Sequence, residues 1–336
     1  MTRVSIGDMA QGHMLRIHNQ RMKEQMGTLI DEMASGRTAD ISRHLTGSYA
    51  YLSDVERKLT ILEGYATATA EAQVLTSAMQ DALELFQSFG QDLGLAAVAA
   101  TSTHVPEAVA HVSQRAQGDF ARMVSALNTD TGGRAIFSGT ATDRAPLADP
   151  EVILADLRLA LAGQTTAGGV QAVVDAWFDD PGGGFETLGY TGGADTLAPL
   201  AVADGETLAL TIKADDSVFR DQLKQAAVIA LASDATLGFD VELQRDIVKT
   251  AAETLAFRQD ALTGLRGTLG QAETRVDDTL ARIGAEQVSY QMARTELLSV
   301  DPYETASRLE DVQYQLEALY SVTVRLSRLS MLEFMR

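Results

Sequence analysis

A seven-residue repeat of apolar residues runs through the segment from Asp240 to Ser299. Its members are Val241, Val248, Leu255, Leu262, Leu269, Val276, Ile283, Tyr290 and Leu297. This period keeps one narrow stripe facing a partner helix, which is typical of a coiled-coil seam. Because Asp240 is a suitable N-cap and the segment contains no proline, the pattern predicts one helix of roughly 85–90 Å, at about 1.5 Å per residue.

Similar patterns predict helices at both ends of the chain, over residues 4–34 and from Asp301–Pro302 to the end. Polar breaks at residues 35–47 and at Asp301–Pro302 separate these end helices from the rest. Their apolar stripes are Leu15, Met22, Met26, Leu29 and Met33 in the first, and Leu309, Val312, Leu316, Leu319, Val322, Leu326 and Leu329 in the last. Two helices bury little surface alone, so we interpret the stripes as an assembly interface, although an intramolecular core would show the same pattern.

The middle of the chain differs in composition. Residues 141–214 hold four of the six prolines, ten of the 27 glycines and the only tryptophan. This shift predicts a small, outward-facing α+β domain, with helices at 150–162 and 170–178 and a hairpin around Asp204–Gly205. Further helices are predicted over 48–99, from Pro106 and over 217–232, with a short β-hairpin following the Pro106 helix.

The predicted fold is therefore mainly α, a long antiparallel coiled-coil helix bundle built from the N- and C-terminal segments. We divide the chain into a terminal coiled-coil assembly domain (1–45 with 300–336), a rod-like helical bundle domain (46–140 with 215–299) and the inserted domain (141–214).

Charge and composition exclude several classes of function. The formal net charge of −19 argues against binding to nucleic acid or anionic membranes, and only −1 of it lies in residues 1–45 and 301–336. The chain has no cysteine, no stretch typical of a membrane span and no Sec-type signal. These features alone would predict a cytoplasmic protein.

Candidate catalytic chemistry is weak. The five histidines lack zinc-motif spacing, the glycine runs lack phosphate-loop spacing, and the acidic pairs lack a calcium-loop pattern. We therefore expect no catalytic residues, no metal site and no cofactor.

Four passages resemble the flagellin superfamily. They are TLIDEMASGRTADI near the N-terminus, ALNTDTGGRAIFSGTATDRAPL after the third helix, the long stretch from TRVDDTLARIGAEQ to YSVTVRLSRLSML, and the ending RLSRLSMLEFMR. The second, with its FSGT hairpin, is the most specific. The sequence ADISRHLTGSYA departs from the superfamily pattern after the first break.

The resemblance implies a non-enzymatic structural protein that links the hook-associated region of a bacterial flagellum to its filament. The implied partners are further copies of the chain in a ring layer, a preceding hook-associated protein, flagellin and a cytoplasmic export chaperone. It also implies export through the flagellar type III apparatus without a Sec signal, which would reverse the cytoplasmic prediction.

Two other hypotheses stay open. The chain could be a filament flagellin, which would grow long filaments alone. It could instead be a closed cytoplasmic coiled-coil scaffold, whose end helices would be fully folded in the dilute monomer. An enzyme in residues 141–214 is the least favoured reading, since that segment lacks a convergent polar constellation.

Overall fold

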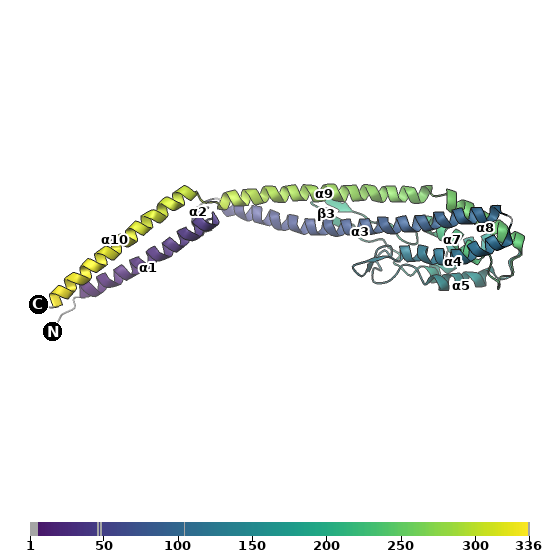
Figure 1. Ribbon diagram of the computed structural model, residues 1–336, viewed down its shortest axis with the longest axis horizontal. Helices are drawn as coiled ribbons and strands as arrows, with labels where there is room; N and C mark the ends of the chain where they lie inside the picture. The colour runs from purple at the N-terminus through teal and green to yellow at the C-terminus, as the bar shows by residue number, and fades with distance from the viewer. Residues whose placement is uncertain (1–5, 46, 48, 104, 335–336) are drawn as a thin grey trace. The chain divides into compact units, whose positions relative to one another are not determined.

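The structure is a computed structural model that describes residues 6–45, 47, 49–103 and 105–334, with the side chains of all of these except 6–9, 11 and 326–334. Helices dominate it (Figure 1), which confirms the predicted mainly α fold class. They are α1 (Ile6–Ser35), α2 (Ile41–His44), α3 (Tyr49–Ser102), α4 (Pro106–Leu127), α5 (Pro150–Leu161), α6 (Ala167–Asp179), α7 (Ser217–Leu231), α8 (Val241–Phe257), α9 (Asp260–Leu298) and α10 (Pro302–Phe334).

The strands form two short antiparallel hairpins. The first pairs β1 (Asp130–Thr131) with β2 (Arg134–Ala135), and the second pairs β3 (Leu200–Ala203) with β4 (Glu206–Leu208). Both lie where glycine-containing turns predict them, and Gly205 has the positive φ of 71° that its turn requires. The sequence did not predict the π-helical turn at Phe185–Gly189.

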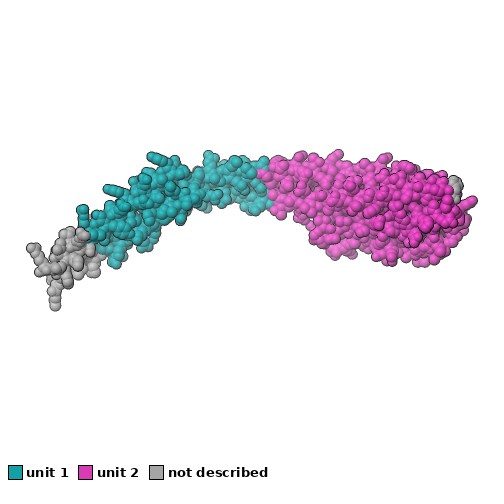
Figure 2. Space-filling model, in the orientation of Figure 1, with its two compact units in different colours: residues 1–63, 285–336 teal, residues 64–284 magenta. Residues whose placement is uncertain are grey.

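The chain divides into two compact units (Figure 2). Residues 1–63 and 285–336 form what we call the terminal unit, and residues 64–284 form the body unit. The terminal unit contains α1, α2, α10 and one end each of α3 and α9. The predicted three-part division of the assembled protein stays a prediction.

One continuous hydrophobic core holds the body unit together. Phe219 on α7 lies at its centre, with ring centroids 5.4 Å from Phe86 on α3 and 6.2 Å from Phe137. Side chains of the predicted insert, including Leu157, Val174 and Phe178, belong to the same core. Residues 141–214 thus pack on the long helices within the body unit, and their status as a separate domain stays a prediction.

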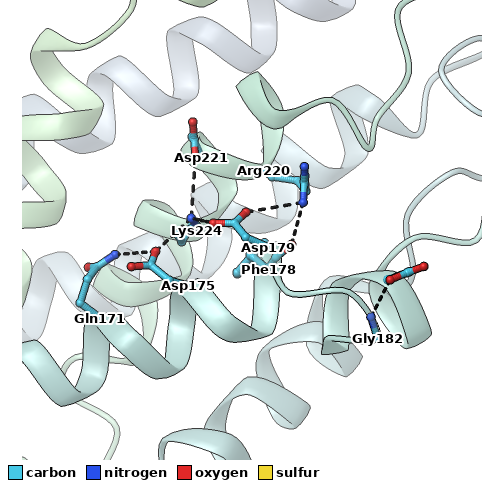
Figure 3. Close-up of polar contacts among 9 residues, drawn as sticks. Gln171, Asp175, Phe178, Asp179, Gly182, Arg220, Asp221 and Lys224 are labelled. Atoms are coloured by element: carbon cyan, nitrogen blue, oxygen red, sulfur yellow. Dashed lines mark hydrogen bonds and ion pairs between the residues drawn. The ribbon is translucent and has the colours of Figure 1, made fainter.

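Within the body unit, an ionic cluster joins α6, which belongs to residues 141–214, to α7 (Figure 3). The ammonium of Lys224 on α7 contacts Asp175 at 3.0 Å and also Asp179, both on α6, and Asp221 at 3.6 Å. The Lys224 side chain is only 6% exposed. Arg220 Nη1 donates to the carbonyl of Phe178 at 3.0 Å.

Helices α3 and α9 lie side by side in opposite directions within the body unit (Figure 1). The side chain of Gln73 donates to Asp277 at 2.7 Å, and Arg266 donates to Gln87 at 2.8 Å. The antiparallel pairing is confirmed because the residue number falls along one helix as it rises along the other. The heptad residues from Val248 to Ile283 are buried, whereas Val241 is 48% exposed.

The predicted uninterrupted helix from Asp240 to Ser299 is wrong. Asp240 does cap a helix, accepting a hydrogen bond from the backbone of Leu243 at 2.8 Å, but α8 ends at Phe257 and α9 begins at Asp260. The cause is tertiary packing against other helices, because the local sequence favours continuation.

Candidate assembly surface

Helices α1 and α10 lie side by side in the terminal unit (Figure 1) and carry the twelve predicted interface residues. Leu29, Val312 and Leu316 are buried within the chain. Five others, Leu15, Met22, Met26, Leu309 and Leu319, are half-buried. Met33 and Val322 are 51% and 48% exposed. Leu326 and Leu329 lie outside the described side chains. The centre of each stripe therefore already serves to pair α1 with α10.

The terminal unit has little apolar core of its own beyond this pair. Leu45, Leu52 and Leu298 form a small buried cluster at the start of α3 and the end of α9. Helices hold their shape mainly through packing of an apolar face, so a unit with small clusters is only weakly stabilised by them.

Exposed apolar side chains concentrate on the terminal unit. Among the side chains that the structure describes, fifteen of the 23 exposed large hydrophobic ones lie there, although it is the smaller unit. Isolated exposed apolar side chains are normal on any surface, but a concentration of them marks an interaction surface. The terminal unit is therefore the candidate interaction surface.

Sequence reasoning missed several of these residues because they lie off the predicted stripes. Ile17 on α1 is 38% exposed, and Tyr303 and Tyr314 on α10 are 85% and 74% exposed. The spacing of eleven residues between the two tyrosines is close to three helical turns, so both lie on one face of α10. The spacing of the two tyrosines is the sequence signal from which this exposed face of α10 could have been predicted.

A backbone joint connects the two predicted breaks. The N–H of Thr38 donates to the carbonyl of Leu298 at 2.9 Å, and the N–H of Val300 donates to the carbonyl of Gly36 at 3.1 Å. Gly36 has a positive φ of 67°, which glycine adopts without a steric penalty. The carboxylate of Asp301 accepts from the N–H of Tyr303 at 2.8 Å and so caps α10. Both predicted helix breaks are confirmed.

A polar groove of about 900 Å³ lies at this joint. Arg21, Arg43 and Arg308 line it beside Glu32 and Glu304. Charges of both signs are interspersed, so the groove favours polar contacts of a protein surface over one small ion of either charge.

A second polar contact joins α1 to α10 further from the joint. Hydrogen bonds from Asn19 and Lys23 lower the pKa of the Tyr320 phenol. Asn19 occupies a position in the apolar stripe of α1, where a polar residue favours one register of a helix pair over others.

Charge is distributed unevenly between the units. The body unit carries 30 acidic and 14 basic residues, a formal charge of −16, which leaves −3 for the terminal unit. Copies of the chain can therefore approach through their terminal units with little mutual repulsion, whereas body units repel one another.

The described residues contain no group of three or more histidine and acidic side chains placed to hold a metal ion. In the same part of the chain, no helix is long and apolar enough to cross a membrane. The concentration of exposed apolar side chains on the terminal unit is what makes its surface the candidate site.

Comparison with known proteins finds similarity in the helical C-terminal part of the sequence and in the fold. Residues 257–335 match the family model of the bacterial flagellin C-terminal helical region. Among solved structures, a chain from Vibrio parahaemolyticus described as a "putative flagellar hook-associated protein" has the same fold. Its TM-score is 0.51 at 13% identity, and the likeness covers 75% of this chain and 99% of that one. No curated protein matches the chain.

The resemblance noted in the sequence is therefore confirmed for residues 257–335, which are similar to the flagellin C-terminal helical region, and the chain shares its fold with the Vibrio chain. The flagellin-like part comprises α9 and α10, which contribute half of the candidate surface. The match supports a structural role in the bacterial flagellum.

Proposed function

We propose that this chain is a hook–filament junction protein, of the kind called hook-associated protein 3. In this proposal, copies of the chain form a ring layer between a preceding hook-associated protein and the first flagellin subunits. The observation that carries it is the concentration of exposed apolar side chains on a nearly neutral terminal unit whose α10 and end of α9 are flagellin-like.

The mechanism is positional. The buried side chains of Leu29, Val312 and Leu316 hold α1 to α10, and the exposed ones, such as Met33 and Val322, pack against α1 and α10 of neighbouring copies. The stripe residues therefore divide into those that shape the helix pair and those that contact partners. Burial of the second group would stabilise the layer by about 25 cal/mol for each Å² removed from water.

The proposal also includes the export of the chain from the cell. The chain would leave the cell unfolded through the flagellar type III apparatus, after a cytoplasmic chaperone has held its C-terminal segment. The flagellin-like sequence of residues 257–335 supports this step.

The test adds purified protein to isolated hooks that carry the preceding hook-associated protein, followed by flagellin. We expect the chain to bind hook tips and to permit filament growth, both visible by electron microscopy. The double variant Met33→Asp with Val322→Asp should not bind. Leu159→Asp, at an apolar position of the body unit that is more exposed still, is the control and should bind normally. Normal binding by the double variant would overturn the proposed interface.

Two alternatives give different results. A filament flagellin would grow long filaments without hooks. A closed scaffold is favoured by the burial of Leu29, Val312 and Leu316 within one chain, and it would stay monomeric and leave hook tips bare.

A further inference from the structure

The break between α8 and α9 lies where the sequence predicts continuous helix. Leu255 and Leu262 are consecutive members of the apolar repeat on either side of it, and both are buried. The sequence from Thr254 to Thr263 contains neither proline nor glycine, the strongest helix breakers. The chain nevertheless leaves the helical conformation at Arg258, where φ is −107° and ψ is 63°. Local sequence and structure therefore favour different conformations here.

Two glutamine side chains replace the hydrogen bonds that the break removes. In an unbroken helix, the Leu255 carbonyl would accept from the backbone N–H of Gln259, and the Arg258 carbonyl from that of Leu262. Instead, Nε2 of Gln259 donates to the Leu255 carbonyl at 2.5 Å. Nε2 of Gln222 on α7 donates to the Arg258 carbonyl at 3.2 Å. The broken conformation is thus held by specific side-chain donors.

Close packing fixes the end of α8 beside the break. A Cβ atom added to Gly94 on α3 would lie 2.6 Å from the backbone nitrogen of Ala256. Gln222 is only 5% exposed, so α3 and α7 together enclose the last turn of α8. The body unit therefore imposes the break on a segment that would otherwise continue as helix.

The break has costs that a continuous helix would avoid. Oε1 of Gln259 is buried and has no hydrogen-bond partner among the described residues. The aromatic side chain of Phe257 is 66% exposed. Buried unpaired polar atoms and exposed aromatic rings both disfavour the state that contains them, which brings the two conformations closer in free energy.

We propose that residues 257–260 are a two-state hinge. One state is the broken conformation held by Gln222 and Gln259, and the other is a continuous helix from Val241 to Leu298. The transition exchanges side-chain donors for backbone donors, so it needs no unfolding of either helix. It lets α9 change direction relative to α8, and any contact that favours one direction selects that state.

Amide hydrogen exchange distinguishes the two states. The amides of residues 260–262 begin α9, and in the broken state they have no carbonyl within that helix to donate to. In the continuous helix they would donate to the carbonyls of residues 256–258. We expect Gln222→Ala in the full-length protein to slow their exchange by up to roughly fivefold, because the loss of about one net hydrogen bond shifts the balance between the two states by at most that factor.

Two further variants make the test decisive. Gln259→Ala removes the orphaned oxygen and the hydrogen bonds that Nε2 of Gln259 donates to the Leu255 carbonyl and, at 3.2 Å, to Oε1 of Gln222. It should therefore slow exchange in the same way, even if Gln222→Ala fails to fold. Arg258→Gly, which disfavours continuous helix, should cancel the effect of Gln222→Ala. Gln225→Ala, at another buried glutamine of α7, is the control and should leave exchange unchanged. Unchanged or faster exchange at 260–262 in the folded Gln222→Ala or Gln259→Ala variants would overturn the proposal.

Discussion

Lys224 has an almost fully buried ammonium group surrounded by three aspartates from α6 and α7. Removing one partner of such a cluster leaves the other charges poorly compensated. We expect Lys224→Ala to lower the free energy of unfolding by about 1–3 kcal/mol, since the carboxylates keep partial access to water. Lys224→Met retains the packing of the aliphatic stem and should lose less. Urea unfolding measures both variants; a larger loss for Met than for Ala would contradict the argument.

The same cluster predicts loss of stability at alkaline pH. Burial acts to lower the pKa of Lys224, but hydrogen bonds from its ammonium to Asp179 and Asp175 outweigh it, and the pKa lies above the usual 10.5. Burial, helped by the charges of Asp215 and Asp216, raises the pKa of Tyr190 above its usual 10.0. The folded state thus favours the ammonium and the neutral phenol, so stability is full below these usual values and falls as the pH rises above them. We expect Lys224→Met combined with Tyr190→Phe to flatten the fall of the melting temperature between about pH 10 and pH 12; an unchanged slope would contradict this.

Gly139 is the glycine of the FSGT passage, and its backbone requires it. Its φ is +57°, and an added Cβ would lie 2.3 Å from the carbonyl oxygen of Asp195. We expect Gly139→Ala to lower the free energy of unfolding by more than about 1 kcal/mol, because strain and overlap act together. Gly118 lies within α4 with no atom near its Cβ position, so Gly118→Ala should instead stabilise by about 0.5–1 kcal/mol. Thermal melts should show a lower melting temperature for Gly139→Ala and a higher one for Gly118→Ala. Changes of the same sign in both variants would contradict the prediction.

Most helices could be predicted from the sequence because their signals are local. Pro106, Pro150 and Pro302 each begin a helix, and the polar breaks at both ends lie where composition places them. The break at Arg258 could not be predicted, since its causes are Gly94 and Gln222, far away in the sequence. The shared core of residues 141–214 was missed for the same reason.

The candidate surface could be predicted only in part. Apolar periodicity finds the stripe that contains Leu29, Val312 and Leu316, but it cannot tell which of its members pair within the chain. The exposed residues Tyr303 and Tyr314 lie outside the stripe, and no local rule identifies an exposed residue as a contact. Periodicity therefore predicts the helix pair better than it predicts the surface offered to partners.

The distinction between pairing and contact residues is testable on α10. Leu316 is 9% exposed and Val322 is 48% exposed, both on the same helix. We expect Leu316→Asp to separate α10 from α1, because it places a charge in their buried contact. Limited proteolysis of the dilute monomer should then remove both ends much faster than in the wild type. Val322→Asp should leave proteolysis unchanged yet reduce assembly, and equal cleavage of the two variants would show that α1 and α10 are already loose.

At the scale of the whole molecule, apolar surface and charge are divided between the two units. The terminal unit offers most of the exposed apolar side chains and carries a charge of −3, while the body unit carries −16. An assembly made through terminal units must also bring acidic body units near one another. Association is thus driven by one unit and opposed by the other.

This opposition predicts how salt acts on assembly. The Debye length falls from about 30 Å at 0.01 M to about 3 Å at 1 M ionic strength, which screens repulsion between body units but leaves apolar burial in place. We expect raised sodium chloride to strengthen self-association of the full chain, measured by sedimentation velocity at fixed protein concentration. The Met33→Asp with Val322→Asp variant should gain much less, because it lacks the apolar contact that repulsion opposes. Weaker association at high salt would mean that ion pairs, such as those available to Arg21 and Arg308 in the joint groove, hold the copies together instead.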